Sequence, residues 1–179
     1  QRLGGATWFR LGDKDLATHL WRTCLLDRGE SLSQVTDLLA RQLGIASRIH
    51  PMCDGLVRTT VHCQGRDLPF QHYFVKEHCA PVVTGFSFEG IADARPNATV
   101  MALLRGTAFA SIVVCPSNPF VSIDPILQIP DFWPALRDNP APVVVVSPIV
   151  SGLAIKGPAA KMMAELEVPV TALGVVQHY

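Results

Sequence analysis

The chain has 179 residues, of which 49% are hydrophobic and 17% are charged. This composition is sufficient for a globular domain with a buried core, and it excludes an intrinsically disordered chain. Fifteen basic and fifteen acidic residues cancel, so the sequence lacks the basic surface that drives nucleic-acid binding.

Two further classes of protein are excluded by short patterns. The longest apolar run, residues 142–150, is far shorter than the ~20 residues that span a bilayer. Five cysteines are scattered without Cys-x-x-Cys spacing, which argues against a disulfide framework and against a zinc site. We therefore expect reduced thiols, mostly in the core, in a cytoplasmic protein that contacts neither a membrane nor nucleic acid.

The first hundred residues predict helices and a small mixed sheet. Residues 13–28 repeat apolar side chains at the helical period, and Asp13 or Asp15 is expected to cap the start of this helix. A second helix, 32–43, begins with a Ser31/Gln34 capping box and ends before Gly44. Strands are predicted at 45–50, 57–63 and 82–88 and a helix at 97–105, whereas 70–78 fits a helix or a strand.

The last part of the chain has a different pattern. Two β-branched runs, 109–115 and 143–146, end in proline-containing turns, and a helical segment at 158–166 follows the second run. Continuous apolar strands that alternate with helices favour a parallel sheet buried on both faces. We predict an α/β fold in one continuous domain: a Rossmann-like parallel sheet flanked by helices in residues 106–179, after an α+β insertion or cap portion in residues 1–105.

The first predicted strand end of that sheet carries a proline-rich segment, residues 115–125. Ligands of parallel α/β sheets bind at the carboxyl ends of the strands. Ser117, Asn118 and Ser122 offer compact hydrogen-bonding groups there, which suit a base edge or a phosphate. A proline-rich turn in which Asn118 caps a helix explains the pattern equally well. At the second strand end, Lys156 precedes a helix start and is a candidate phosphate ligand, although an ordinary strand-to-helix loop is the favoured interpretation.

A third candidate site lies at the start of the first predicted helix. Aromatic residues, Trp8 and Phe9, precede Arg10, Asp13 and Asp15. The two carboxylates could bind a metal or act as a base, and the guanidinium could bind a phosphate. Helix capping and surface ion pairs explain the same charges and are the more frequent case. The histidines show no metal-ligand spacing within one element and receive no ligand role: His50, His62, His72 and His78.

Taken together, these segments resemble the 2-phospho-L-lactate transferase family, whose members act in the biosynthesis of the deazaflavin coenzyme F-420. The resemblance extends through the chain in order and is most specific in the Gly-Asp-Lys-Asp helix start, the Pro-Ser-Asn-Pro turn and the Lys-Gly-Pro block. Lys14 and the turn at Cys53 to Gly55 depart from the family pattern. The matching stretches are residues 4–19, 51–54, 57–59, 68–75, 85–90, 115–127, 146–150 and 154–163.

The resemblance implies a magnesium-dependent transferase. Such an enzyme moves a phospholactyl or phosphoenolpyruvyl group from a guanosine diphosphate conjugate to the terminal hydroxyl of the deazaflavin Fo, and it releases GMP. The catalytic residues that this implies are Asp13 and Asp15. The substrate-binding residues that it implies are Arg10, Trp8, Ser117, Asn118, Ser122 and Lys156. Metal ligands are not assigned, and a homodimer is expected because the family commonly forms dimers.

Family members are longer than this chain and carry a glycine-rich N-terminal region with an Asn-Thr-Gly-Asp-Asp motif, as well as a further C-terminal region. We therefore expect a fragment that lacks both regions, that lacks some metal ligands and that is inactive alone. A related family of similar fold binds UDP-sugars without transfer chemistry. A non-enzymatic nucleotide-sugar-binding regulator is therefore the alternative function. The sequence does not distinguish a lactyl from an enolpyruvyl donor.

Overall fold

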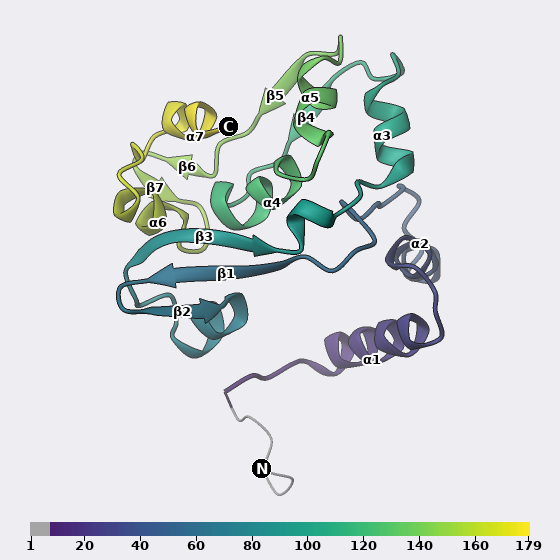
Figure 1. Ribbon diagram of the computed structural model, residues 1–179, viewed down its shortest axis with the longest axis horizontal. Helices are drawn as coiled ribbons and strands as arrows, with labels where there is room; N and C mark the ends of the chain where they lie inside the picture. Colours follow the sequence, from purple (N-terminus) through teal and green to yellow (C-terminus); the bar gives the residue numbers. More distant parts are fainter. Residues whose placement is uncertain (1–7) are drawn as a thin grey trace, which may run out of the picture.

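The fold was obtained as a computed structural model, which describes residues 8–179. A three-stranded antiparallel sheet of order β2–β1–β3 crosses the middle of the molecule (Figure 1). In this view α1 lies below the level of the sheet, α2 lies beyond its right end, and the parallel pair β4–β5 with its helices lies above it. A short hairpin, β6–β7, packs with α6 and α7 at the left of the view.

Short elements make up most of the second half of the chain. Within residues 8–179 the helices are α1 (Asp13–Asp27), α2 (Leu32–Gln42), α3 (Ala98–Leu104), α4 (Asp124–Leu127), α5 (Phe132–Arg137), α6 (Ala159–Glu165) and α7 (Ala172–His178). The strands are β1 (Arg58–Cys63), β2 (Arg66–Pro69), β3 (Val83–Glu89), β4 (Ile112–Val114), β5 (Val143–Val145), β6 (Ile149–Val150) and β7 (Leu153–Ala154). Two π-helical turns, η1 (His72–Lys76) and η3 (Pro119–Ile123), and a 3-10 turn, η2 (Ile91–Asp93), complete the set.

The two N-terminal helices are confirmed, but the predicted cap of the first is wrong. Gly12 is the N-cap of α1, and no side chain caps this helix. Asp13 and Asp15 lie instead in its first turn, where carboxylates interact favourably with the helix dipole. α2 has the predicted capping box: the Gln34 N–H donates to Ser31 Oγ at 3.2 Å, and the Ser31 N–H donates to Gln34 Oε1 at 2.8 Å.

The antiparallel sheet confirms two of the three strands predicted in the first half. β1 and β3 lie where 57–63 and 82–88 were expected, and α3 lies where 97–105 was expected, with Asn97 as its cap. The predicted strand at 45–50 is wrong, because this segment finds no strand partner in the described chain and leaves Ile45 and Ile49 exposed. The mixed sheet is also a wrong prediction, since both pairings of β1 are antiparallel. Part of the ambiguous segment 70–78 forms η1.

The predicted parallel pairing of the two β-branched runs is confirmed. β4 and β5 pair in parallel with Val113 opposite Val144. The prediction that both faces of this sheet are buried is wrong, because these two side chains are 53% and 48% exposed. On the side of α3, α4 and α5, an apolar hollow of about 550 Å³ adjoins β4. The pair is therefore apolar on both faces but incompletely covered by the residues that the structure describes.

The segment predicted as a loop between β5 and α6 contains a hairpin. β6 and β7 pair antiparallel, with Ile149 opposite Ala154. Ser151 and Gly152 form the turn with φ of 51° and 77°, and two successive positive φ values are typical of the tight turns that join antiparallel strands. The hairpin was missed because two strands of two residues each show no alternation that a pattern can detect.

The main hydrophobic core joins both parts of the chain. β1 and β3 contribute Val61 and Val83, and these pack with Phe120, Met162 and Val175 from the second part. The same region holds an ordered polar network around Lys161. Its Nζ donates to the Pro81 carbonyl at 2.8 Å and pairs with Glu165 Oε1 at 2.5 Å, while Glu165 Oε2 accepts the Val83 N–H at 3.0 Å. This network ties α6 to the start of β3.

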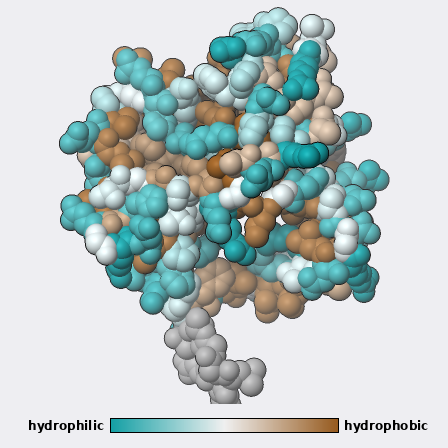
Figure 2. All heavy atoms as spheres, viewed as in Figure 1, coloured by the Kyte–Doolittle hydropathy of each residue, from teal (hydrophilic) through white to brown (hydrophobic). Residues whose placement is uncertain are grey.

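The surface is less uniformly polar than that of a typical small domain. Figure 2 shows brown, hydrophobic side chains among the polar ones, including a group over the region of α1. Leu16, Leu20 and Trp21 of α1 are 47%, 63% and 41% exposed. Because α1 packs mainly on α2, much of its apolar side remains open to solvent in the described chain.

Gly174 gives a test of the packing between α7 and the preceding turn. A Cβ at this position would overlap the Pro169 carbonyl oxygen, a backbone atom that cannot rotate away. We expect Gly174→Ala to lower the free energy of unfolding by about 1–3 kcal/mol. Gly55→Ala is the matched control, because a Cβ there meets nothing within 4 Å and the backbone is not left-handed. Urea denaturation measures both changes, and equal stabilities would contradict the predicted packing.

Candidate functional site

The proline-rich segment lies, as predicted, directly after a parallel strand. It leaves β4, enters the π-helical turn η3 and continues into α4. Asn118 is the N-cap of η3: its Oδ1 accepts the N–H groups of Phe120 at 3.0 Å and Val121 at 3.3 Å, and its Nδ2 donates to Met162 Sδ at 3.2 Å. The capping interpretation of Asn118 is therefore confirmed, and a ligand role for this residue remains a prediction.

The two serines of the segment are more available than Asn118. Ser117 is half-buried and Ser122 is exposed. Within the described residues, neither hydroxyl has a hydrogen-bond partner in the structure, whereas the Ser122 N–H donates to the Asn118 carbonyl at 3.1 Å. The segment therefore presents two free hydroxyl groups on a backbone that Asn118 holds in place.

The start of α1 presents its charges to solvent. Arg10, Asp13 and Asp15 are exposed, and Asp13 Oδ1 accepts the N–H of the next residue, Lys14, at 2.9 Å. Among residues 8–179, none of these side chains takes part in an ion pair, so the surface-pair interpretation finds no support. The first turn of α1 therefore carries two exposed carboxylates, which interact favourably with the helix dipole.

Trp8 packs where the strand β2 meets the turn η1. Its ring meets the His72 ring edge to face, with centroids 4.9 Å apart, and it meets Phe9 in the same way at 5.7 Å. Phe9 is 39% exposed and is therefore not a core residue. Residues 4–7, which belong to the same matching stretch of sequence, lie outside the described residues.

Lys156 lies between β7 and α6. The side chain is exposed, and the glycine that follows has a φ of 73°. α6 is a short helix whose N-cap is Pro158, which makes no side-chain cap. The location of Lys156 before a helix is as predicted.

The structure assembles two groups of candidate residues and keeps them apart. Ser117, Asn118 and Ser122 share one segment, and Arg10, Asp13 and Asp15 share one helix start. In Figure 1 the three-stranded sheet lies between α1 and the end of β4.

One polar pair at the proline-rich segment was missed by sequence reasoning. Asp124, the first residue of α4, meets His178 at the end of α7, and both side chains are largely buried. The pair lines a hollow of about 300 Å³ together with Gln128, Trp133 and Tyr179. Burial raises the pKa of Asp124, and the hydrogen bond and charge of His178 oppose this effect. The pKa of Tyr179 rises to about 12, chiefly through burial. No sequence pattern links positions so far apart.

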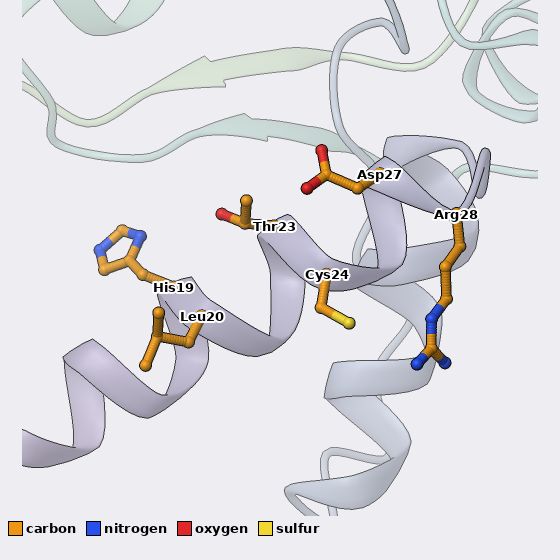
Figure 3. Close-up of a pocket in the computed structure, with 6 residues that line it drawn as sticks. All are labelled: His19, Leu20, Thr23, Cys24, Asp27 and Arg28. Carbon is orange, nitrogen blue, oxygen red and sulfur yellow. The ribbon is translucent and has the colours of Figure 1, made fainter.

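A second hollow, of about 520 Å³, runs along α1 (Figure 3). His19, Thr23 and Asp27 point to one side of the helix, at successive helical spacings that begin from Asp15. His19 Nδ1 also lies 2.5 Å from Arg22 Nη2. All the lining residues come from α1 and its C-cap, so the hollow is a groove along one wall rather than an enclosed pocket. The groove begins at His19, one helical turn after Asp15, so it continues along α1 from the candidate site.

The described chain holds neither a preformed cluster of metal ligands nor a membrane-spanning helix. Residues 8–179 contain no group of three or more His, Cys, Asp or Glu side chains placed to hold a metal ion. Mg²⁺ in nucleotide enzymes is usually held by one or two carboxylates and by substrate phosphates, so this observation leaves the magnesium prediction open. Every helix in the described chain is too short or too polar to cross a bilayer.

Comparison with known proteins identifies the family. A model of the family 2-phospho-L-lactate transferase CofD matches residues 5–178. The chain belongs to this family. A phosphoenolpyruvate transferase from Kitasatospora aureofaciens is 41% identical over 180 residues, which cover 98% of this chain and 55% of that protein. A 2-phospho-L-lactate transferase from Methanopyrus kandleri is 36% identical over 181 residues, which cover 100% of this chain and 57% of that protein. The chain spans about half the length of the curated relatives it matches.

Solved structures agree with the family fold. A crystal structure of a Bacillus halodurans protein superposes with a TM-score of 0.62 at 12% identity, over 94% of this chain and 55% of that chain. A second crystal structure of the same Bacillus halodurans protein, described there as a UPF0052 family member, gives a TM-score of 0.55 at 13% identity, over 68% of this chain and 38% of that chain. At these identities the likeness concerns the fold alone, and it confirms the predicted α/β class.

Substitutions of Asn118 separate its capping role from a ligand role. We expect Asn118→Ala to lower the free energy of unfolding by about 1 kcal/mol, because two N–H groups lose their acceptor. Asn118→Asp keeps the acceptor oxygen and is expected to retain most of that stability. If the amide also donates to a guanine nucleotide, Asn118→Asp will weaken GDP binding in calorimetry without an equal loss of stability. Unchanged GDP affinity in both variants would leave Asn118 with the capping role alone.

The raised pKa of Asp124 predicts a pH dependence of stability. Because the folded state binds this proton more tightly than the unfolded state, Asp124 contributes stability at a pH below its unfolded pKa, and this contribution is lost as the pH rises through the folded pKa. The difference in unfolding free energy between the unaltered chain and Asp124→Asn is expected to fall as the pH rises above the ordinary carboxyl pKa of about 3.9, and to level off above the raised pKa of the folded state. Urea denaturation across this range measures it. A difference that grows with pH would contradict the sign.

Proposed function

We propose that this chain forms part of a transferase that moves a phospholactyl or phosphoenolpyruvyl group from a guanosine diphosphate conjugate to the deazaflavin Fo. The observation that carries the proposal is the family match over residues 5–178. Relatives with both names, phosphoenolpyruvate transferase and 2-phospho-L-lactate transferase, align over nearly all of this chain. The proposal therefore includes both donors, which differ in the small acid that they carry.

The reaction requires positioning and charge stabilisation more than covalent catalysis. The terminal ribityl hydroxyl of Fo attacks the phosphorus that bears the lactyl or enolpyruvyl group. A new phosphorus–oxygen bond forms, the bond to the bridging diphosphate oxygen breaks, and GMP leaves with that oxygen. The hydroxyl proton passes to a base, and a carboxylate within hydrogen-bond reach is suited to accept it.

The start of α1 supplies the residues that we assign to the acceptor. Asp13 and Asp15 are exposed and free of ion pairs within residues 8–179, so either carboxylate can approach a substrate hydroxyl. Arg10 offers a guanidinium that can bind two phosphate oxygens at once. Trp8 presents a half-buried ring that suits the flat deazaflavin. These assignments follow the family resemblance and are supported by accessibility.

The proline-rich segment is our assignment for the nucleotide half of the donor. Its location at the carboxyl end of a parallel strand is where α/β folds bind ligands. The free hydroxyls of Ser117 and Ser122 can donate to base or phosphate oxygens, and Lys156 is a further cationic candidate. A bound Mg²⁺ would neutralise the diphosphate, with ligands taken largely from the phosphates themselves. We also propose a cytoplasmic location and a homodimer, as in the family.

Variants at the α1 start test the acceptor assignment. Because the chain covers about half of its relatives, the assay uses a chimera in which this sequence replaces the aligned segment of the Methanopyrus kandleri transferase. We expect Asp13→Asn or Asp15→Asn to reduce transfer to Fo by about 10²-fold, the scale of lost acid–base catalysis. Asp37→Asn is the matched control, since Asp37 is exposed on α2 and pairs with Arg41. GMP release is measured with both donors and Mg²⁺.

Three outcomes of this assay decide the proposal. Loss of transfer with unchanged melting supports the catalytic assignment. Full turnover in both variants and in Arg10→Lys overturns it while leaving the transferase itself in place. A chimera that binds UDP-N-acetylglucosamine but neither Fo nor GDP would contradict the transferase and favour the nucleotide-sugar-binding regulator.

A further inference from the structure

Asp124 and His178 are 54 positions apart and meet where the proline-rich segment packs against α7. His178 Nε2 lies 3.0 Å and 2.9 Å from the two oxygens of the Asp124 carboxylate. The Asp124 side chain is 17% exposed and the His178 side chain is 24% exposed. Partial burial weakens the competition from water and makes such a bond more costly to break than a surface pair.

The proline-rich segment is held at three places, and this pair is the last of them. Asn118 holds the start of η3 and reaches Met162 of α6. Phe120 is 3% exposed and stacks on Phe86 of β3 at a centroid distance of 5.6 Å. Asp124 then follows η3, where the chain turns into the short helix α4. The backbone of Ser122 lies between the last two contacts, so its place depends on both.

We propose that Asp124 and His178 form a positioning pair, which holds the C-terminal half of the proline-rich segment in the conformation that binds the nucleotide of the donor. This inference rests on the proposed function, because the nucleotide assignment of the segment belongs to it. The pair does not touch the reacting atoms. It acts through the backbone of residues 119–125, which it joins to α7.

The imidazole contributes in two ways that can be separated. Its Nε2–H donates to the Asp124 carboxylate, which fixes the ring tautomer and the direction of the bond. Its ring packs edge to face on Phe120 at a centroid distance of 4.7 Å. The positioning role requires the donor, whereas a purely packing role requires the ring. Glutamine places an amide nitrogen at a reach similar to Nε2, and phenylalanine keeps a ring without a donor.

The chain contains a second histidine–aspartate pair that serves as a matched control. His62 Nδ1 lies 2.8 Å from Asp67 Oδ1 in the β1–β2 hairpin, and the side chains are 34% and 64% exposed. These residues are five positions apart and already opposite each other in the antiparallel register. The chemistry is the same, but the pair joins two strands that the sheet already holds together.

Hydrogen exchange of the 179-residue chain tests the positioning directly and requires no ligand. We expect Asp124→Ala and His178→Phe, which remove the acceptor and the donor, to raise amide exchange in a peptide that covers residues 119–127 by about tenfold, with little change in β1 and β3. His178→Gln is expected to restore most of the protection. Asp67→Ala, the matched control, should leave the same peptide unchanged. Unaltered exchange in Asp124→Ala and His178→Phe would overturn the proposal, whatever the protein binds.

GDP affinity of the chimera, measured by calorimetry, tests the consequence for the nucleotide. We expect the dissociation constant for GDP to be about tenfold larger in Asp124→Ala and in His178→Phe, near-normal binding in His178→Gln, and a double variant no worse than either single one. In turnover assays the KM for the donor should rise more than kcat falls. Normal binding in His178→Phe with weak binding in His178→Gln would show a packing role and contradict the pair. Altered exchange without any change in GDP affinity would overturn the link to the nucleotide.

These assays distinguish a failure of the proposed function from a failure of the Asp124–His178 proposal. An unaltered chimera that binds no GDP would contradict the nucleotide assignment itself and, with it, the functional half of this inference. The exchange experiment would still decide whether Asp124 and His178 hold the segment.

Discussion

Phe120 lies in the turn η3, which follows β4, and its ring packs in the main core and stacks on Phe86 of β3. Through this contact, the parallel part of the chain packs on the antiparallel part. A buried aromatic ring of this size is among the largest single contributions to a core. The proline-rich segment carries this anchor in its own middle, so the candidate nucleotide segment and the core cannot move independently. Asn118 and Asp124 flank the anchor and complete its attachment.

The start of α1 is organised in the opposite way. Its charged residues are exposed and α1 packs mainly on α2, so their positions depend on the path of the chain rather than on side-chain contacts. The Trp8 ring, against His72 of η1, links this region to the turn that follows β2. In the transferase proposed above, the nucleotide would therefore meet the rigid segment and the acceptor would meet the more loosely held α1 start, which can adjust to it.

Strong local patterns predicted the fold well. The Ser31 capping box, the Asn97 cap and the parallel pairing of β4 with β5 all follow from short stretches of sequence. The strand expected at 45–50 does not form because a short strand needs a partner, and no element of the described chain pairs with this segment. The β6–β7 hairpin could not be predicted because strands of two residues show no periodic pattern. The Asp124–His178 pair could not be predicted because it depends on tertiary packing between positions far apart in the chain. Asn118 was predicted as a cap or a ligand, and its local geometry establishes the first role.

The β4–β5 ladder also determines how the chain behaves at high concentration. In the described residues it is a sheet of two strands, so each strand keeps one row of N–H and C=O groups without a strand partner, next to half-exposed valines such as Val113 and Val144. Unpaired strand edges beside apolar side chains are templates for pairing between molecules. In concentrated samples, self-association of the chain would therefore start at this ladder. The apparent molecular mass in scattering experiments would then rise with concentration unless these strand edges are covered.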